Sequence, residues 1–403
     1  MIMLFQRKCI LLLYTYAKQI ILRLRKLIWW TVTLRLTHEM RRWRADQHLG
    51  LFATRYNFDL EMLRGSDNFR IEAAAGFDGQ VKVLRLTEVG RFGNIVLQLL
   101  HAITLARHLG VRKVEIFPFN GGPAEGLYDI DDIIVEVAIK EKTTQPTLIG
   151  PFCHSVNFGT VLCADLLTGS NDIIVNIMRP LFAHLIEPVL EAPVDQLIIN
   201  LRGGDIFEGP FIYAWYVQPP ASFYVLAAIN ARQMFGIRRV TLVAQDRLNP
   251  ALLVTMHKLS EKGFDVTVHC EGFAADLQQI MQARHLVAPF GTFCEAIAML
   301  SINLRSYTAF RQFESHRHEH LGRECLLLHV LREHGVLPIL IKDVEMDYIP
   351  PLHWNRTASQ MAMMRDFPCD RLAVDLPQDN TDNFCVAKFG ENVPPHIQPN
   401  VQS

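Results

Sequence analysis

The alternation of strand-like and helix-like segments between Leu197 and Phe310 is the feature that most constrains how this chain can fold. Short apolar runs of strand length alternate with longer amphipathic runs, and Pro, Gly or polar residues separate them. This alternation is typical of a parallel, doubly wound α/β sheet. We expect strands at Leu197–Ile199, Arg239–Ala244, Phe264–His269, His285–Ala288 and Leu304–Phe310. We expect helices at Ala221–Phe235, Pro250–Lys262, Phe273–Ala283 and Thr292–Leu300.

The preceding part of the chain begins in the same manner. A strand pattern at Val81–Leu86 leads through a glycine turn into an amphipathic helix at Ile95–Leu109, which Gly110 can end, and Val114–Phe117 is the next strand. Two α/β units joined near residue 190 would place the loops at their strand ends across a shared cleft, where ligand sites concentrate.

The length of 403 residues suits two domains with additional segments. We expect an amino-terminal arm and linker at 1–79, a Rossmann-like domain at 80–190 and a second Rossmann-like domain at 191–350. Residues 351–403 are rich in Pro, Asn, Asp and Gln, so we expect a loop-rich tail there.

The amino-terminal arm is strongly basic. Residues 1–44 hold ten Lys or Arg against the single acid Glu39, which leaves 30 basic and 40 acidic residues in the rest of the chain. No apolar run in the arm approaches the ~20 residues that cross a bilayer. Cations interleaved with Leu, Ile and Trp suit a helix that lies on a membrane surface, over residues 1–36. A helix packed on the body of the protein, or on a second copy, is the alternative.

The eight cysteines contain no CxxC pair and no spacing typical of a zinc site or a small disulfide framework. This pattern indicates mostly buried thiols in a reducing compartment. We therefore expect a cytoplasmic protein, peripheral at a membrane. The alternative is the Golgi lumen, reached through an atypical amino-terminal anchor.

The segment Leu197–Phe207, with sequence LIINLRGGDIF, places charged residues directly after a predicted strand. Ligands gather at the carboxyl ends of strands in open α/β sheets. The guanidinium of Arg202 has a planar fork of donors that suits phosphate. Gly203 and Gly204 lack the Cβ that would keep a ligand from the backbone. A salt bridge between Arg202 and Asp205 at the end of an ordinary strand explains the segment equally well.

A glycine-bracketed turn precedes the first long helix. Gly90, Arg91, Gly93 and Asn94 belong to this turn, whose backbone N–H groups and helix dipole favour an anion. Asn94 can also cap the helix. The turn lacks the third glycine of a dinucleotide fingerprint, and a simple tight turn is the alternative reading.

A second anion site is indicated where a later strand ends. Gly291 turns the chain and Thr292 stands at the start of the next helix, beside Phe293. Thr292 as an ordinary helix N-cap is the alternative. Asp246, at the end of another strand, suits hydrogen bonds from a ribose or a base edge, or a pair with Arg247.

Two glutamates are candidates for a general base, because each lies in or beside a predicted ligand loop. Glu208 follows Asp205 by three residues, and Glu88 precedes the Gly90 turn. Asp129 and Asp131 have the spacing of a metal-binding DxD, but no clear apolar strand precedes them, so we interpret them as a solvated acidic turn. We expect no metal site.

Taken together, these motifs resemble the GDP-fucose-using fucosyltransferase superfamily. The segment VGRFGNIVLQLLHAITLARHLG resembles its amino-domain signature, and INLRGGDIF resembles its HxRRGD-type loop and, more closely, an HIRSGDIF version of it. The segments YVQPPASFY, VAQDRLNP and APFGTFCEAIAMLSINL resemble later blocks of the group in the same order. The resemblance covers residues 81–312.

The resemblance implies a GT-B architecture, with two Rossmann-like domains facing a cleft, and inversion at the sugar without an essential metal or other cofactor. By position, Arg202 would stabilise the leaving β-phosphate and Asp205 would hold that loop. Asp246 would contact the nucleoside. Donor-binding positions would further include Gly90, Arg91, Gly93, Asn94, Asn200, Gly203, Gly204, Gly291, Thr292 and Phe293.

Three positions depart from the family pattern. Asn200 replaces the motif histidine, Gly203 replaces the second arginine, and Ile95 replaces the glutamine of the amino-domain motif. We expect an inverting glycosyltransferase that moves a sugar, with fucose as one candidate, from a GDP-linked donor to a glycan or cell-envelope saccharide, with no nucleic-acid partner. The alternatives are a catalytically silent glycan- or nucleotide-binding protein of the same fold and an unrelated nucleotide-binding Rossmann enzyme.

Overall fold

The computed structural model describes residues 47–56, 58, 60, 69–74, 76–87, 90–138, 145–152, 169–187, 192–212, 214, 216–311, 318–350 and 353–376. The predicted membrane-surface segment 1–36 and the candidate base Glu88 lie outside these residues. The boundary near residue 190 also falls outside them, so the division at that point stays a prediction. In the part of the chain that is described, no helix has both the length and the apolar character to cross a membrane.

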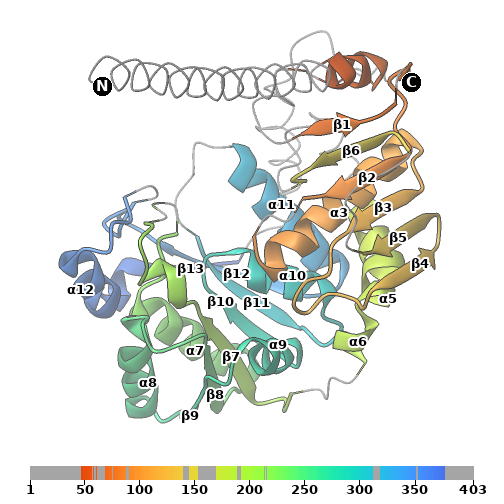
Figure 1. Ribbon diagram of the computed structural model, residues 1–403. Helices are drawn as coiled ribbons and strands as arrows, with labels where there is room; N and C mark the ends of the chain where they lie inside the picture. Colours follow the sequence, from red (N-terminus) through yellow and green to blue (C-terminus); the bar gives the residue numbers. More distant parts are fainter. Residues whose placement is uncertain are drawn as a thin grey trace, which may run out of the picture.

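The first sheet is built from the amino-terminal half of the chain (Figure 1). Its strand order is β1-β6-β2-β3-β5-β4. The inner strands β6, β2, β3 and β5 pair in parallel, and the edge strands β1 and β4 are antiparallel to their neighbours. The bounds are β1 Arg70–Glu72, β2 Val83–Leu86, β3 Lys113–Ile116, β4 Gly126–Ile130, β5 Ile133–Val137 and β6 Thr147–Gly150. Because β1 belongs to this sheet, the predicted arm and linker at 1–79 are wrong for residues 70–72.

The second sheet has the strand order of a doubly wound nucleotide-binding fold. It runs β13-β12-β11-β10-β7-β8-β9, and every pair except β12 and β13 is parallel. The strands are β7 Gln196–Leu201, β8 Arg239–Ala244, β9 Asp265–His269, β10 His285–Ala288, β11 Ser306–Arg311, β12 Leu337–Asp343 and β13 Leu372–Asp375. The order of the strands reverses between β7 and β10, which is where such sheets bind ligands.

Helices connect the strands at nearly the predicted positions. In the first unit these are α3 Phe92–Leu109, the π-helix η2 Ile174–Met178, α5 Arg179–Leu181 and α6 Ala183–Ile186. In the second they are η3 Gly204–Ile206, α7 Ala221–Phe235, α8 Ala251–Glu261, α9 Phe273–Met281, α10 Thr292–Leu300, α11 His318–Glu333, α12 Ala358–Asp366 and η4 Cys369–Arg371. Gly110 and Gly236 end α3 and α7 in the left-handed conformation, as predicted. The α/β class with two Rossmann-like units is confirmed.

The predicted loop-rich tail is wrong for residues 353–376. Helix α12 and strand β13 lie in this range, and β13 pairs with β12 antiparallel. Thr357 and Gln360 form a reciprocal capping box that starts α12. Trp354 is completely buried. This segment therefore closes the edge of the second sheet, although its composition is that of a loop.

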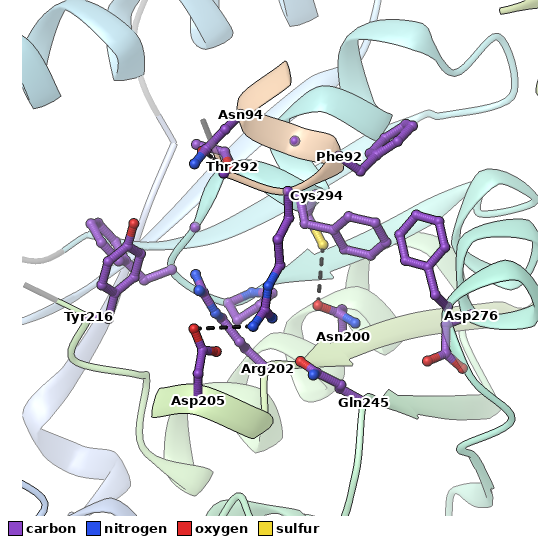
Figure 2. Close-up of a pocket in the computed structure, with 18 of the residues that line it drawn as sticks. Phe92, Asn94, Asn200, Arg202, Asp205, Tyr216, Gln245, Asp276, Thr292 and Cys294 are labelled. Carbon is purple, nitrogen blue, oxygen red and sulfur yellow. Dashed lines mark hydrogen bonds and ion pairs between the residues drawn. The ribbon is translucent and has the colours of Figure 1, made fainter. Parts of the chain in front are cut away.

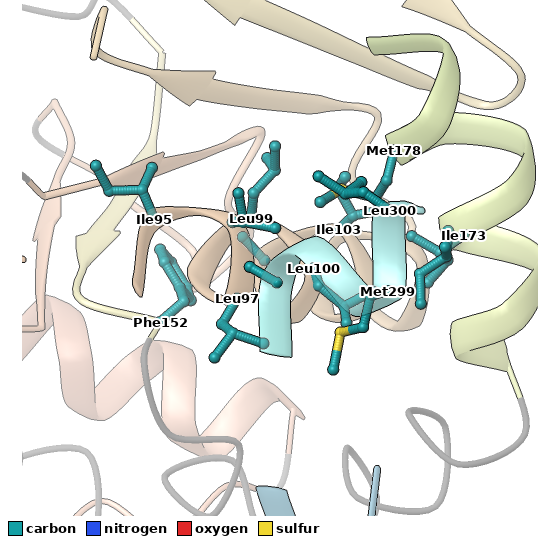
Figure 3. Packing of buried hydrophobic residues seen from close by; sticks show 14 of the residues in the cluster. Ile95, Leu97, Leu99, Leu100, Ile103, Phe152, Ile173, Met178, Met299 and Leu300 are labelled. Carbon is teal, nitrogen blue, oxygen red and sulfur yellow. The ribbon is translucent and has the colours of Figure 1, made fainter. Parts of the chain in front are cut away.

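One hydrophobic core joins the two units. Helix α3 lies between the first sheet and α10, and its buried residues surround the helix instead of forming one stripe. Figure 3 shows Leu97, Leu100 and Ile103 of α3 beside Met299 and Leu300 of α10. At this carboxyl-terminal end of α10, the guanidinium of the part-buried Arg179 donates to the carbonyl oxygens of Met299, Leu300 and Ser301. The two sheets are thus held by shared packing as well as by their connections.

Candidate functional site

A cavity of about 520 Å³ lies at the point where the strand order of the second sheet reverses. Its walls come from both units: the glycine turn before α3 on one side, and the loops after β7, β8, β9 and β10 on the other. The residues that line it include Gly90–Asn94, Asn200–Arg202, Asp205, Tyr216, Gln245, Gly272, Phe273, Asp276 and Pro289–Cys294. The shared cleft that the sequence predicts between the two units is therefore present.

Arg202 forms the floor of one end of the cavity. It follows β7, and its guanidinium carbon lies 4.5 Å from the centre of the Tyr216 ring. A Cβ on Gly291 would lie 2.6 Å from Arg202 Nη1, so the cation packs directly on the glycine backbone. Burial lowers the pKa of Arg202, while Tyr216 and Asp205 oppose that shift. An arginine keeps its proton even so, and the site presents a fixed positive charge.

The loop that carries Arg202 is held by the segment after β8. Asp246 accepts hydrogen bonds from Gly204 N–H at 2.6 Å and from Leu248 N–H at 2.8 Å, one on each carboxylate oxygen. The buried Asn249 donates to the carbonyl oxygen of Arg202 at 2.9 Å. Asp246 does not line the cavity. Its observed contacts support the Arg202 loop, and its contact with a nucleoside stays a prediction.

Gly203 cannot be replaced by a larger residue in this arrangement. A Cβ at this position would overlap the carboxylate of Asp246. Gly204 has a φ of 64°, a conformation that glycine adopts without strain. The arginine that the family pattern has at position 203 is therefore excluded by the packing of Asp246.

Asp205 pairs with an arginine of the other unit. Its Oδ2 lies 3.3 Å from Nη2 of Arg91, which belongs to the glycine turn before α3. Its Oδ1 is buried without a hydrogen-bond partner. The predicted salt bridge within the loop, between Arg202 and Asp205, is not among the ion pairs of the described residues, and the pair to Arg91 takes its place.

The two glycine turns contact each other directly. The Thr292 hydroxyl donates to Asn94 Oδ1 at 2.6 Å, and a Cβ on Gly93 would lie 2.5 Å from the backbone of Thr292. The cap readings of these residues are wrong: Arg91 and Gly291 occupy the N-cap positions, and neither helix has a side-chain cap. Asn94 is the third residue of α3 and Thr292 is the first residue of α10, and their side chains bond to each other. The amide ends of α3 and α10 are consequently left open beside the cavity.

A third open helix end lies at the opposite end of the cavity. Helix α9 begins after Gly272 without a side-chain cap. The rings of Phe92, Phe273 and Phe293, one from the start of each helix, form a triangle with centroids 5.9 to 6.0 Å apart. Figure 2 places Asp276 at this end, away from Arg202 and Tyr216. The cavity thus has a cationic end and an aromatic end.

Asp276 is the carboxylate of the aromatic end. It is buried in the first turn of α9, with Oδ1 3.4 Å from Glu271 N–H and 3.5 Å from Nε2 of His269. Burial raises its pKa, against the opposing hydrogen bond from Glu271 N–H. The sequence motifs do not single out Asp276, Gln245 or Tyr216, which also line the cavity. Gln245 follows β8 directly, so the strand-end rule could have found it.

The remaining predicted residues fall in three groups. Asn200 lies in the wall, where it donates to Val243 O at 3.2 Å and accepts from Cys294 Sγ at 3.5 Å. Glu208 is exposed and does not line the cavity. Asp131 pairs with Arg107 at 2.6 Å. Among the described residues, no group of three or more His, Cys, Asp or Glu is placed to hold a metal ion.

Known proteins resemble this chain only distantly. No protein-family model and no curated protein matches the sequence. Among solved structures, an Arabidopsis thaliana FUT1 variant in complex with GDP is similar over 78% of this chain and 77% of that chain, with 12% identity and a TM-score of 0.36. POFUT1 in complex with GDP is similar over 64% of this chain and 95% of that chain, with 8% identity and a TM-score of 0.29. Both TM-scores are low, so the functional proposal rests on the residues of the cavity.

Proposed function

We propose that this chain is an inverting glycosyltransferase that takes a sugar from a GDP-linked donor and transfers it to a hydroxyl group of a saccharide. The observation that carries the proposal is the position of Arg202, whose guanidinium lies at the strand-order reversal between the Tyr216 ring and the backbone of Gly291. A half-buried fixed cation beside the open amide ends of α3 and α10 is suited to a diphosphate.

In the proposed reaction, an acceptor oxygen attacks the anomeric carbon of the donor sugar as the bond from that carbon to the β-phosphate oxygen breaks. The electron pair of that bond passes to the phosphate. Arg202 stabilises the negative charge that develops there, and because its charge is already in place, no reorganisation is needed in the transition state. The acceptor proton passes to a carboxylate.

Asp205 is the proposed acceptor of that proton. It lines the cationic end of the cavity, and its side chain is 32% exposed, so an acceptor hydroxyl can approach it. A general base must reach the proton that it removes, and Glu208, one of the two glutamates that the sequence offers, is exposed outside the cavity lining. Asp205 therefore replaces Glu208 in the mechanism that we propose.

The aromatic end of the cavity is suited to the base of a guanine nucleotide. The triangle of Phe92, Phe273 and Phe293 provides an apolar surface for a base. The Asp276 carboxylate can accept hydrogen bonds, and guanine presents two adjacent donors, N1–H and the exocyclic amine, whereas uracil presents a single N–H. We expect Asp276→Asn to reduce the preference for GDP over UDP.

Calorimetry and a transfer assay test the proposal together. The wild type should bind GDP more tightly than UDP, and Arg202→Ala should abolish sugar transfer from GDP-sugars while the circular dichroism spectrum stays unchanged. Arg202→Lys keeps the charge without the planar fork, so we expect partial activity. Failure of the wild type to bind either nucleotide, or full activity of Arg202→Ala, would overturn the assignment.

A catalytically silent nucleotide-binding protein is the second candidate. The observation that favours it is the packing of Asp246 on Gly203, which leaves this loop with a single arginine. Tight GDP binding without hydrolysis or transfer, measured over a panel of GDP-sugars, supports this candidate. Turnover of any donor in the panel contradicts it.

A further inference from the structure

We propose that residues 207–212, here called the rim loop, form the acceptor subsite, where a pyranose ring stacks on Phe211 and its hydroxyl groups donate to Glu208. This inference rests on the proposed glycosyltransferase function, since it names where the second substrate binds. It assigns a role to Phe211, which is 70% exposed and is the most exposed aromatic side chain in the described part of the chain. Phe211 does not line the donor cavity.

The rim loop belongs to the cationic end of the cavity. It leaves the wall at Asp205, and the chain returns to the wall at Tyr216. Figure 2 shows both residues at the end of the cavity that lies away from Asp276. A donor that places its base at the aromatic end and its β-phosphate at Arg202 directs its sugar toward this end. An acceptor held by the rim loop would meet that sugar beside Asp205.

The segment that follows β12 holds the rim loop through hydrogen bonds and ring packing. Arg356 Nη2 donates to the carbonyl oxygens of Gly209 and Phe211 at 3.0 and 3.2 Å. The indole N–H of the buried Trp354 donates to Ile206 O at 3.2 Å, and the Trp354 ring meets Phe207 edge-on at 5.7 Å. Arg356 has a positive φ of 54°, which a non-glycine residue adopts only where its surroundings hold it.

These contacts hold the backbone of Phe211 while its ring faces solvent. Because the backbone of Phe211 is already held, binding a ligand would not have to remove backbone freedom at this position. The same segment bonds to the carbonyl oxygens of Gly209 and Phe211, and the side chains of Glu208 and Phe211 remain exposed.

The chemistry of the exposed side chains fits a saccharide. One face of a pyranose ring carries C–H groups that can cover an aromatic ring, and its hydroxyl groups remain free to hydrogen bond. Phe211 supplies the ring, and the exposed carboxylate of Glu208 supplies the acceptor. Within the rim loop, the exposed large hydrophobic side chains are Phe211 and the adjacent Ile212, which is 48% exposed. A stable protein interface covers about 800 Å² on each partner, much more than two side chains offer.

The test uses the full chain with saturating GDP on an array of defined oligosaccharides. We expect the wild type to retain a subset of these glycans. Phe211→Ala should weaken their binding at least tenfold, and Phe211→Trp, which keeps an aromatic face, should restore it. Leu253→Ala is the matched control, because Leu253 is 64% exposed on α8, outside the cavity lining and the rim loop. All variants should bind GDP as the wild type does, which shows that the donor site is intact.

The outcomes separate the two proposals. If the wild type binds GDP but retains no glycan, or if Phe211→Ala retains the same glycans with equal affinity, the acceptor subsite is wrong and the donor site stands. Loss of self-association in Phe211→Ala without any change in glycan binding would likewise overturn it, in favour of a protein interface. If the wild type binds no nucleotide, the proposed function fails, and the acceptor role fails with it.

Discussion

Arg91 and Asp205 form an ion pair that connects the two α/β units across the cavity, with Nη2 and Oδ2 3.3 Å apart. Their side chains are 60% and 32% exposed, so water screens the pair. Pairs of this kind contribute about 0.2–1 kcal/mol to stability. Arg91 can therefore exchange Asp205 for a stronger anionic partner at little cost, and it can supply from the first unit the second cation that Gly203 does not provide.

Replacing Arg91 tests this exchange. We expect Arg91→Ala to weaken binding of GDP about tenfold, because one charge-assisted contact to phosphate is lost, and to leave the melting temperature nearly unchanged. Guanosine, which has no phosphate, should bind both proteins equally in calorimetry. Arg238→Ala, at an exposed position outside the cavity, is the control. Equal affinity of Arg91→Ala and wild type for GDP would contradict the exchange.

Gly291→Ala should displace the Arg202 guanidinium without unfolding the protein. The new methyl group would lie 2.6 Å from Arg202 Nη1, and the φ of 141° at this position adds backbone strain. We expect loss of GDP binding by calorimetry, with a modest decrease in melting temperature. Gly263→Ala separates the two effects, because Gly263 also has a positive φ but has no atom within 4 Å of the new methyl group. That variant should lose stability only.

The sequence predicts the second unit well because each local signal there agrees with the tertiary structure. Helices α7 and α10 and strands β8 and β10 have the predicted bounds. The segment 353–376 was missed because its polar composition conceals two long-range contributions, the buried Trp354 and the pairing of β13 with β12. Neither the partner strand nor the pocket for the indole can be read from local composition.

The candidate site, too, is only partly predictable from the sequence. The sequence locates the loops that meet at the cavity, since strand ends and glycine turns are local features. It does not reveal which side chains are engaged with each other. Asn94 and Thr292 are 198 residues apart, and the sequence offers each as a possible cap of its own helix, but their side chains bond to each other. The Asp246 carboxylate likewise accepts hydrogen bonds from the backbone N–H groups of Gly204 and Leu248.

Gly93→Ala should destabilise the contact between α3 and α10. The added methyl group would lie 2.5 Å from the backbone of Thr292, which cannot move as a flexible side chain can. Overpacking of this kind costs about 1–3 kcal/mol. We expect that decrease in the free energy of unfolding by urea denaturation. Gly169→Ala, with a negative φ and no neighbour within 4 Å of the new methyl group, should be neutral or slightly stabilising.

The stability of the protein should decrease as the pH falls from about 6.5 to about 4. Burial, together with the charge of Arg284, lowers the pKa of His285 to about 4, whereas a histidine in the unfolded chain has a pKa near 6.5. Between these values the unfolded state binds a proton that the folded state does not, so the stability present above pH 6.5 is progressively lost.

Thermal melts across this pH range can detect the effect. His285 stacks on Phe235 with ring centroids 4.4 Å apart, and its Nδ1 lies 2.8 Å from the Ser306 hydroxyl. His285→Asn should lower stability at pH 7.5 but give a flatter pH dependence. His257→Asn, at an exposed position on α8, should keep the slope of the wild type. If the melting temperature of His285→Asn changed with pH as steeply as that of the wild type, groups other than His285 would account for the effect.

Replacing the two loop carboxylates should separate proton transfer from acceptor binding. Asp205→Asn removes the proposed base, so we expect kcat to fall at least a hundredfold with little change in the KM of the acceptor. Glu208→Gln keeps a hydrogen-bond acceptor outside the cavity and should mainly raise that KM. The reverse pattern would return the role of base to Glu208. Initial rates at varied acceptor concentration distinguish the two results.

The core that α3 and α10 share has a consequence for how a donor enters. Two units that close on a ligand need a flexible hinge, but here the helices between the sheets are packed on each other and bonded at their starts through Asn94 and Thr292. Domain closure is therefore not available as the gating motion. Association of GDP should be a single kinetic phase whose observed rate rises linearly with nucleotide concentration in stopped-flow measurements, without the plateau that a slow closing step would impose.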